Sequence, residues 1–119
     1  MVEEQTVRRW VAGYVTAWNS NSRDDIVALF TDDARYYTEP YADPWQGHDE
    51  IVQNWLEQKD EPGETAFDYD VLAIDGNVAI VKGETDYRTP PRSYSNLWEI
   101  TFAPDGRALT FVEWWMKKK

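Results

Sequence analysis

A change of hydrophobic period near the middle most constrains how this chain can fold. Up to about residue 59, apolar residues recur mainly at three- and four-residue spacing, which is typical of one buried helix face. After residue 64 they alternate with polar residues, as Phe67, Tyr69 and Val71 do with Asp68 and Asp70. Period two is the pattern of a half-buried strand. The sequence therefore predicts a helical first half and a sheet in the second half.

The first half divides into three helices and one strand. A helix is predicted over residues 3–19, a short second helix from the cap at Ser22 through Phe30, and a third over about 48–59. A strand with the sequence ARYYTE (34–39) lies between the second and third helices and ends at Pro40. Residues 41–47 read as a loop, and residues 60–64, with Pro62-Gly63, as a break.

Four strands follow, joined by three short turns. The strands begin near Phe67 and then span 78–87, 93–102 and 108–116, with turns at 75–77, 89–92 and 104–107. Strands joined in sequence by hairpins form a mostly antiparallel sheet, and the helices must cover one face of it. We therefore expect a single α+β domain over residues 1–119. Its curved sheet should pack against three helices around a central cavity.

Composition narrows the classes of function. Seven Trp and seven Tyr in 119 residues exceed what an ordinary core needs, so they line a pocket, form an interface or overfill the core. The net charge of −10 argues against nucleic acid. With no Cys and one His, a metal site is not expected. No apolar run approaches the ~20 residues of a membrane span and no secretion signal opens the chain, so we expect a cytoplasmic protein.

Several motifs together resemble the NTF2-like superfamily, specifically its SnoaL-like and ketosteroid-isomerase-like branch. They are GYVTAWN (13–19), IVALFTDDA (26–34), the Glu39-Pro40 strand end, WQGHDEI (45–51) and APDGRALTFVEWW (103–115). The resemblance covers nearly the whole chain and implies a cone-shaped domain around a cavity. It also implies a small organic ligand and a cofactor-free acid–base enzyme of isomerase, dehydratase or cyclase type. The alternative is a non-catalytic ligand-binding or dimerisation module, since one fold hosts many functions.

The resemblance also points to individual residues. The tyrosine that donates a hydrogen bond to the oxyanion in ketosteroid isomerases corresponds to Tyr14, and the carboxylate base before a proline corresponds to Glu39. The third position of that site holds Trp98 instead of a carboxylic acid, which makes steroid isomerisation an unfavoured reading. Tyr14 could instead belong to a core stripe with Trp10 and Trp18, and Glu39 could be an exposed loop residue.

Strand alternation adds Glu113 as a third candidate for catalysis. If Phe111 and Trp115 point inward, period two carries Glu113 inward with them. The alternative is a glutamate paired with Lys82 or Arg107. The expected pocket walls are Trp18, Trp55, Asn96, Trp98, Phe111 and Trp115.

Three further expectations concern surfaces. Val112 and Trp114 on the opposite face suggest a sheet-to-sheet homodimer. His48 is expected at the surface, and Trp45 as a pocket lid or interface residue. On the strand after Asn77, a face with Lys82, Glu84 and Asp86 could line the cavity by analogy with the family or face water by hydrophobicity; the sequence leaves both open.

Overall fold

The computed structural model describes residues 1–59, 63, 65–88 and 91–118. It contains three helices: α1 (Glu4–Ser20), α2 (Arg23–Val27) and α3 (Gly47–Glu57). The six strands are β1 (Phe30–Tyr37), β2 (Trp45–Gln46), β3 (Thr65–Asp75), β4 (Val78–Arg88), β5 (Pro91–Phe102) and β6 (Ala108–Lys117). The break predicted at 60–64 and the turn predicted at 89–92 lie partly outside the described residues.

The predicted order of elements is observed, with two differences in the first half. The second helix ends at Val27, and Phe30 already belongs to β1, where it pairs with Ala108 of β6. The loop predicted at 41–47 contains the short strand β2, because Trp45 and Gln46 pair with β1 at its edge. Both differences come from strand pairing, of Phe30 with the distant β6 and of β2 with the neighbouring β1, which helical spacing does not reveal.

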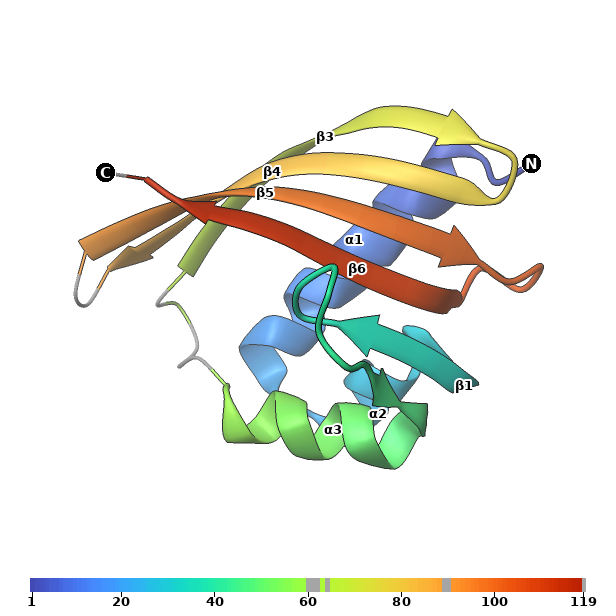
Figure 1. Ribbon diagram of the computed structural model, residues 1–119, viewed down its shortest axis with the longest axis horizontal. Coiled ribbons are helices and arrows are strands. Elements are labelled where there is room, and N and C mark those ends of the chain that lie inside the picture. The colour runs from blue at the N-terminus through green and yellow to red at the C-terminus, as the bar shows by residue number, and fades with distance from the viewer. Residues whose placement is uncertain (60–62, 64, 89–90, 119) are drawn as a thin grey trace.

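The six strands form one curved, unclosed sheet in the order β2-β1-β6-β5-β4-β3. Neighbours are antiparallel except β1 and β6, which run parallel. Figure 1 shows the four long strands arching over α1, with α3 on the far side of β1. This confirms the predicted α+β architecture: a mostly antiparallel curved sheet packed against three helices.

The turns between the long strands follow the chemistry of their sequences. Gly76 has a φ of 62° in the β3–β4 turn, and Gly106 has a φ of 88° in the β5–β6 turn. This left-handed region favours glycine, which has no Cβ to clash. The backbone N–H of Val2 donates to the carbonyl of Gly76 at 2.8 Å, which ties the start of the chain to the first of these turns.

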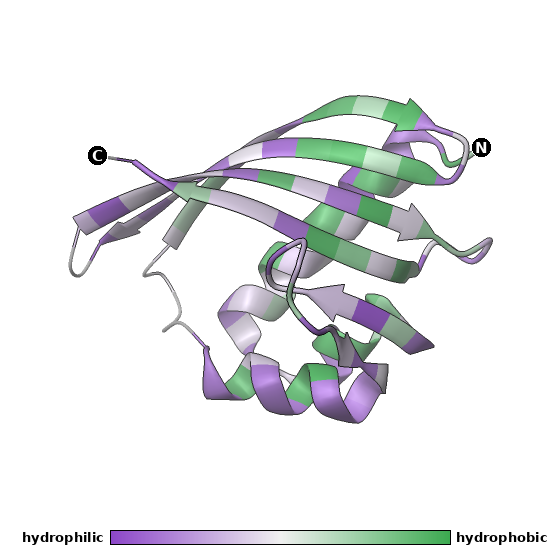
Figure 2. Ribbon diagram, viewed as in Figure 1, coloured by the Kyte–Doolittle hydropathy of each residue, from purple (hydrophilic) through white to green (hydrophobic). Residues whose placement is uncertain are grey.

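The core lies between α1 and the inner face of the sheet. The buried residues of α1 are Val7, Trp10, Val11, Tyr14 and Ala17. Trp10 stacks on Phe111 of β6 with ring centroids 5.8 Å apart, and its indole N–H donates to the carbonyl of Leu29 at 2.8 Å. Figure 2 shows hydrophobic and polar residues alternating along the long strands, as expected when only one face is buried.

The alternation on β4 answers the question that the sequence left open. Lys82, Glu84 and Asp86 are exposed on the outer face, whereas the residues that alternate with them, Ala79, Val81, Gly83 and Thr85, are buried. Hydrophobicity, and not the family analogy, therefore decides which face turns inward. Lys82 and Glu84 consequently do not form a polar network inside the cavity.

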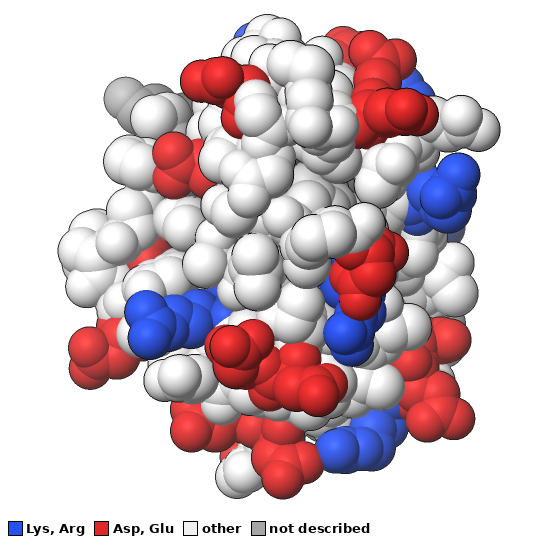
Figure 3. Space-filling view, turned by 90° about the vertical axis from the view of Figure 1, so that its right-hand side faces the viewer, with Lys and Arg blue, Asp and Glu red and all other residues white. Residues whose placement is uncertain are grey.

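The chain is acidic, with a net charge of −10. On the face shown in Figure 3, basic side chains stand apart from one another among acidic ones. Among the described residues, no helix is both long and apolar enough to cross a membrane.

Candidate functional site

A cavity of about 250 Å³ lies between α1, the end of α3, the β1–β2 hairpin and the inner face of β4–β6. Aromatic side chains dominate its wall. Nine of the fifteen described residues that line it are Trp or Tyr: Trp18, Trp45, Trp55, Trp98, Trp115, Tyr14, Tyr36, Tyr87 and Tyr94. The others are polar: Thr38, Gln58, Lys59, Thr85, Asn96 and Glu113. A cavity with aromatic walls and a few convergent polar groups is a common form of a small-molecule site.

Two tyrosines meet inside this cavity. Tyr14 of α1 and Tyr36 of β1 are both buried, and their hydroxyl oxygens are 2.7 Å apart. Burial raises the pKa of Tyr14, and Tyr36 and Glu113 raise it further. Burial and the nearby Glu113 also raise the pKa of Tyr36. Both phenols therefore stay protonated at neutral pH. One of them donates its proton to the other, which leaves one O–H free to donate to a ligand.

Glu113 is the carboxylate of the cavity. It follows the buried Phe111 by two residues on β6, so strand alternation turns it inward. The indole Nε1 of Trp98 and the amide Nδ2 of Asn96 donate to its Oε2 at 2.6 and 3.1 Å. Burial raises the pKa of Glu113 to about 7, although these two hydrogen bonds oppose the rise. Glu113 therefore changes its charge near neutral pH.

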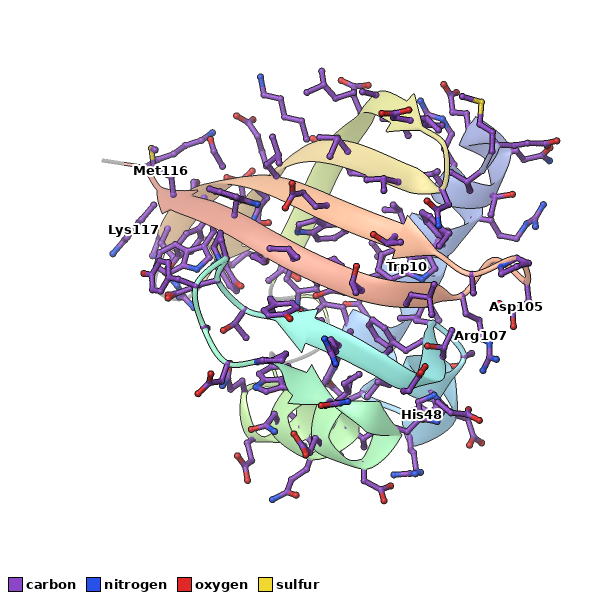
Figure 4. The ribbon with its side chains drawn as sticks, turned by 45° about the vertical axis from the view of Figure 1, so that its right-hand side comes forward. Trp10, His48, Asp105, Arg107, Met116 and Lys117 are labelled. Atoms are coloured by element: carbon purple, nitrogen blue, oxygen red, sulfur yellow. The ribbon has the colours of Figure 1, made fainter. Side chains whose placement is uncertain are left out.

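Neither basic residue considered as a partner for Glu113 contacts it. Lys82 is exposed on the outer face of β4. Arg107 lies near the other end of β6 from Met116 (Figure 4) and pairs with Asp105 at 2.8 Å. Within the described part of the chain, the two donors to this carboxylate are neutral, and burial is the largest influence on its pKa.

A buried threonine extends the polar network. The Oγ1 of Thr85 on β4 donates to the Oδ1 of Asn96 on β5 at 2.7 Å. Asn96 in turn donates to Glu113, so the chain of hydrogen bonds crosses three neighbouring strands. Each of these buried polar groups thereby has a partner, as burial requires.

The tryptophans close the cavity from different sides. Trp45 stacks on Tyr36 with centroids 4.6 Å apart and an interplanar angle of 10°. Trp18 stands edge-on to Tyr14, and Trp55 is buried, with its Nε1 donating to the Oδ1 of Asn21 at 3.3 Å. Trp115 is half exposed at the rim. Of the six predicted wall residues, five line the cavity.

Phe111 is the exception and requires a correction. It is fully buried and does not line the cavity. Its ring stacks on Tyr36 at 4.6 Å and on Tyr14 at 5.6 Å, and those two tyrosines lie between it and the cavity. Phe111 is therefore a core residue that supports the tyrosine pair from behind.

The prediction for Glu39 also requires a correction. This residue lines a second groove of about 660 Å³ on the outer side, with Tyr41, Trp114 and Met116 among its neighbours. Asn96 and Trp115 line both this groove and the cavity. The Glu39 carboxylate accepts a hydrogen bond from the hydroxyl of Tyr41, and this raises the pKa of Tyr41. The chain turns after β1, where Ala42 donates its N–H to the carbonyl of Glu39 at 3.1 Å, and this turn carries the side chain away from the cavity.

His48 is less exposed than expected. Its Nε2 lies 2.8 Å from the carbonyl oxygen of Phe30, so the ring bridges α3 and the start of β1. Among the described residues, no group of three or more His, Asp or Glu side chains could hold a metal ion.

Sequence reasoning missed two members of the site, Tyr36 and Thr85. Tyr36 could have been found, because period two from the buried Ala34 places it on the inner face of its strand. Thr85 carries a hydroxyl on an otherwise apolar strand face, and this is a weaker indication of a site residue. That it meets Asn96 depends on the pairing of β4 with β5.

Comparisons with known proteins agree with the observed fold. The sequence profile of the SnoaL-like domain matches residues 11–116. The search of curated proteins found no significant match. Among solved structures, the epoxide hydrolase/cyclase-like enzyme SalBIII, described in pyran ring formation in the polyether salinomycin, is similar with a TM-score of 0.76 and 19% identity. The alignment covers 98% of this chain and 95% of SalBIII.

Two further structures share the fold at low identity. A ketosteroid isomerase-like protein from Erwinia carotovora atroseptica has a TM-score of 0.68 and 18% identity, covering 99% of both chains. An NTF-2 like protein of unknown function from Burkholderia xenovorans has a TM-score of 0.74 and 15% identity, covering 98% of this chain and 87% of that one. The profile match spans most of the chain, and the chain therefore belongs to the SnoaL-like domain family of the NTF2-like superfamily.

Proposed function

We propose that the cavity is the active site of a cofactor-free acid–base enzyme of isomerase, dehydratase or cyclase type. Glu113 carries the proton, and the pair of Tyr14 and Tyr36 donates one hydrogen bond to the carbonyl oxygen of the ligand, from the hydroxyl that does not donate to its neighbour. The observation that carries the proposal is a carboxylate whose pKa is about 7 beside two protonated phenols in an aromatic cavity.

Each role follows from the environment of the group. A general base works best when its pKa lies near the working pH, and burial brings Glu113 there. Its ionised form accepts a proton from carbon next to the carbonyl, and the resulting acid returns it to another position. The negative charge that develops on the carbonyl oxygen is stabilised by donors already in place, here the tyrosine pair.

The dimensions of the cavity limit the ligand. Its volume of about 250 Å³ is below the ~300–1,000 Å³ of pockets for drug-sized molecules. We therefore propose a small apolar or aromatic ligand with a carbonyl group, not a steroid. The isomerase-like and cyclase-like structural neighbours support this class of chemistry without naming a substrate.

The test measures proton exchange next to a carbonyl. Cyclohex-2-en-1-one, 1-indanone and 1-tetralone are incubated with the chain in D₂O, and deuterium uptake is followed by NMR from pH 5 to 9. The parent should accelerate exchange with a pH dependence centred near 7. Glu113→Gln should lower the rate by ~10²-fold or more while binding, read from tryptophan fluorescence, survives.

Glu39→Gln is the matched control, because Glu39 lies in the outer groove and should exchange like the parent. If Glu113→Gln binds and exchanges like the parent at every pH, the acid–base proposal is wrong. The alternative, a non-catalytic ligand-binding module, follows if the parent itself binds the ketones without accelerating exchange.

A homodimer is a second proposal, supported by the outer face of the sheet. Trp114, Met116 and Tyr41 are 48%, 72% and 86% exposed around the outer groove. Large apolar patches on a soluble protein usually mark an interaction site. Light scattering at micromolar concentration should give the mass of two chains, and Trp114→Ser should shift it toward one. A monomeric parent would contradict the proposal.

A further inference from the structure

Oε2 and Oε1 of Glu113 have different surroundings. Both hydrogen bonds that Glu113 receives, from Asn96 and from Trp98, end on Oε2. Among the described residues, Oε1 has no hydrogen-bond donor. A carboxylate held in this way keeps one oxygen for structure and leaves the other for proton transfer.

The donor from Asn96 depends on how its amide is turned. An asparagine amide has a carbonyl at one end and an NH₂ at the other, and a rotation by 180° exchanges them. With Nδ2 toward Glu113 it stabilises the ionised carboxylate. With Oδ1 toward Glu113 it would repel the ionised form and accept a hydrogen bond from the neutral one. The orientation of this amide therefore influences the charge of the site.

Thr85 selects the first orientation. Its side chain is 2% exposed, and its hydroxyl donates to the Oδ1 of Asn96 at 2.7 Å. Among the described residues, this oxygen is the one acceptor bound by the Thr85 hydroxyl. Turning the amide would bring Nδ2 toward Thr85. The Thr85 hydroxyl could accept from Nδ2, but its own buried proton would lose its acceptor, which costs free energy.

We infer that Thr85 is a positioning residue for Glu113. Its hydroxyl holds the Asn96 amide with Nδ2 on Oε2, which leaves Oε1 as the oxygen that exchanges protons with the ligand. The inference rests on the proposed function, because it assigns Thr85 a role through the proton carrier.

Other titratable groups also line the cavity. They come from each neighbouring element: Tyr14 of α1, Tyr36 of β1, Lys59 after α3, Tyr87 of β4 and Tyr94 of β5. None of them is altered by a substitution at Thr85, so a change in the titration of Glu113 can be ascribed to the amide.

The experiment titrates Glu113 directly, without ligand. Chains labelled with ¹³C at the glutamate carboxyl carbons are followed by NMR from pH 4 to 9, and the Glu113 signal is assigned by its loss in Glu113→Gln. Thr85→Val has nearly the same shape but no hydroxyl, so the midpoint should rise by about one pH unit. Thr85→Ser keeps the hydroxyl and should titrate like the parent.

Two outcomes would overturn the inference: a Thr85→Val midpoint equal to that of the parent, or a Thr85→Ser midpoint that moves as far as that of Thr85→Val. The second would show a packing effect and not a hydrogen bond. Thr85→Ala repeats the test if the valine disturbs folding. Because no turnover is measured, failure here is distinct from failure of the proposed function, which appears as unchanged exchange in Glu113→Gln.

Discussion

Replacing Glu113 by glutamine should change how the stability of the chain depends on pH. Burial raises the pKa of Glu113 from 4.5 to about 7 in the folded state, so the folded chain holds this proton more tightly than the unfolded chain. The resulting contribution to stability is fully present below pH 4.5 and is lost as the pH rises through about 7. Glutamine resembles the neutral acid at every pH and has no such dependence.

The size of the effect follows from the two pKa values. Each pKa unit corresponds to about 1.4 kcal/mol, so the rise from 4.5 to about 7 makes the ionised side chain cost on the order of 3 kcal/mol above pH 7. The carbonyl oxygen of glutamine can still accept from Asn96 and Trp98, as Oε2 does. Glu113→Gln should therefore be similar to the parent or less stable at pH 4 and gain on it as the pH rises to 8.

The assay is urea unfolding followed by tryptophan fluorescence at half-unit steps from pH 4 to 8. The 22 acidic residues of the parent give both chains a strong pH dependence, but all except Glu113 are shared and cancel in the difference. The free energy of unfolding of the parent minus that of the variant should fall by about 3 kcal/mol across this range.

A difference that stays constant within about 0.5 kcal/mol would refute the reasoning, because it would mean that Glu113 ionises as easily in the folded chain as in the unfolded one. Glu39→Gln is the control. The Glu39 side chain lies in the outer groove, so this variant removes an acidic side chain without altering the hydrogen bonds of Glu113.

Two further substitutions test the packing around the site. Gly83→Ala would place a Cβ 2.6 Å from the ring of Phe67, so we expect a loss of ~1–3 kcal/mol in thermal unfolding; a variant as stable as the parent would contradict this close contact. Tyr36→Phe should destabilise the chain by ~1–3 kcal/mol and slow ketone exchange, because the buried hydroxyl of Tyr14 loses its partner. Tyr37→Phe, one residue along and outside the cavity, is the matched control and should leave exchange unchanged; equal effects at the two positions would argue against the tyrosine pair.

The sequence alone determined the order of the three helices and of the five longer strands, and the buried faces of α1 and β6. Helical spacing identified the buried stripe of α1, and alternation with turn residues identified the four long strands. Alternation from Phe111 also turned Glu113 inward, because side-chain direction within one strand depends only on local geometry. Predictions that stay within one element need no knowledge of its neighbours.

The tertiary structure decided which elements meet. Tyr14 and Tyr36 are 22 residues apart and come together only because β1 joins the sheet parallel to β6 beside α1. The path of the chain after β1 turned Glu39 outward. The register between β4 and β5 brought Thr85 to Asn96. The periodicity of one segment shows which of its faces is buried, but the partner of each strand and the direction of each loop depend on packing against other segments.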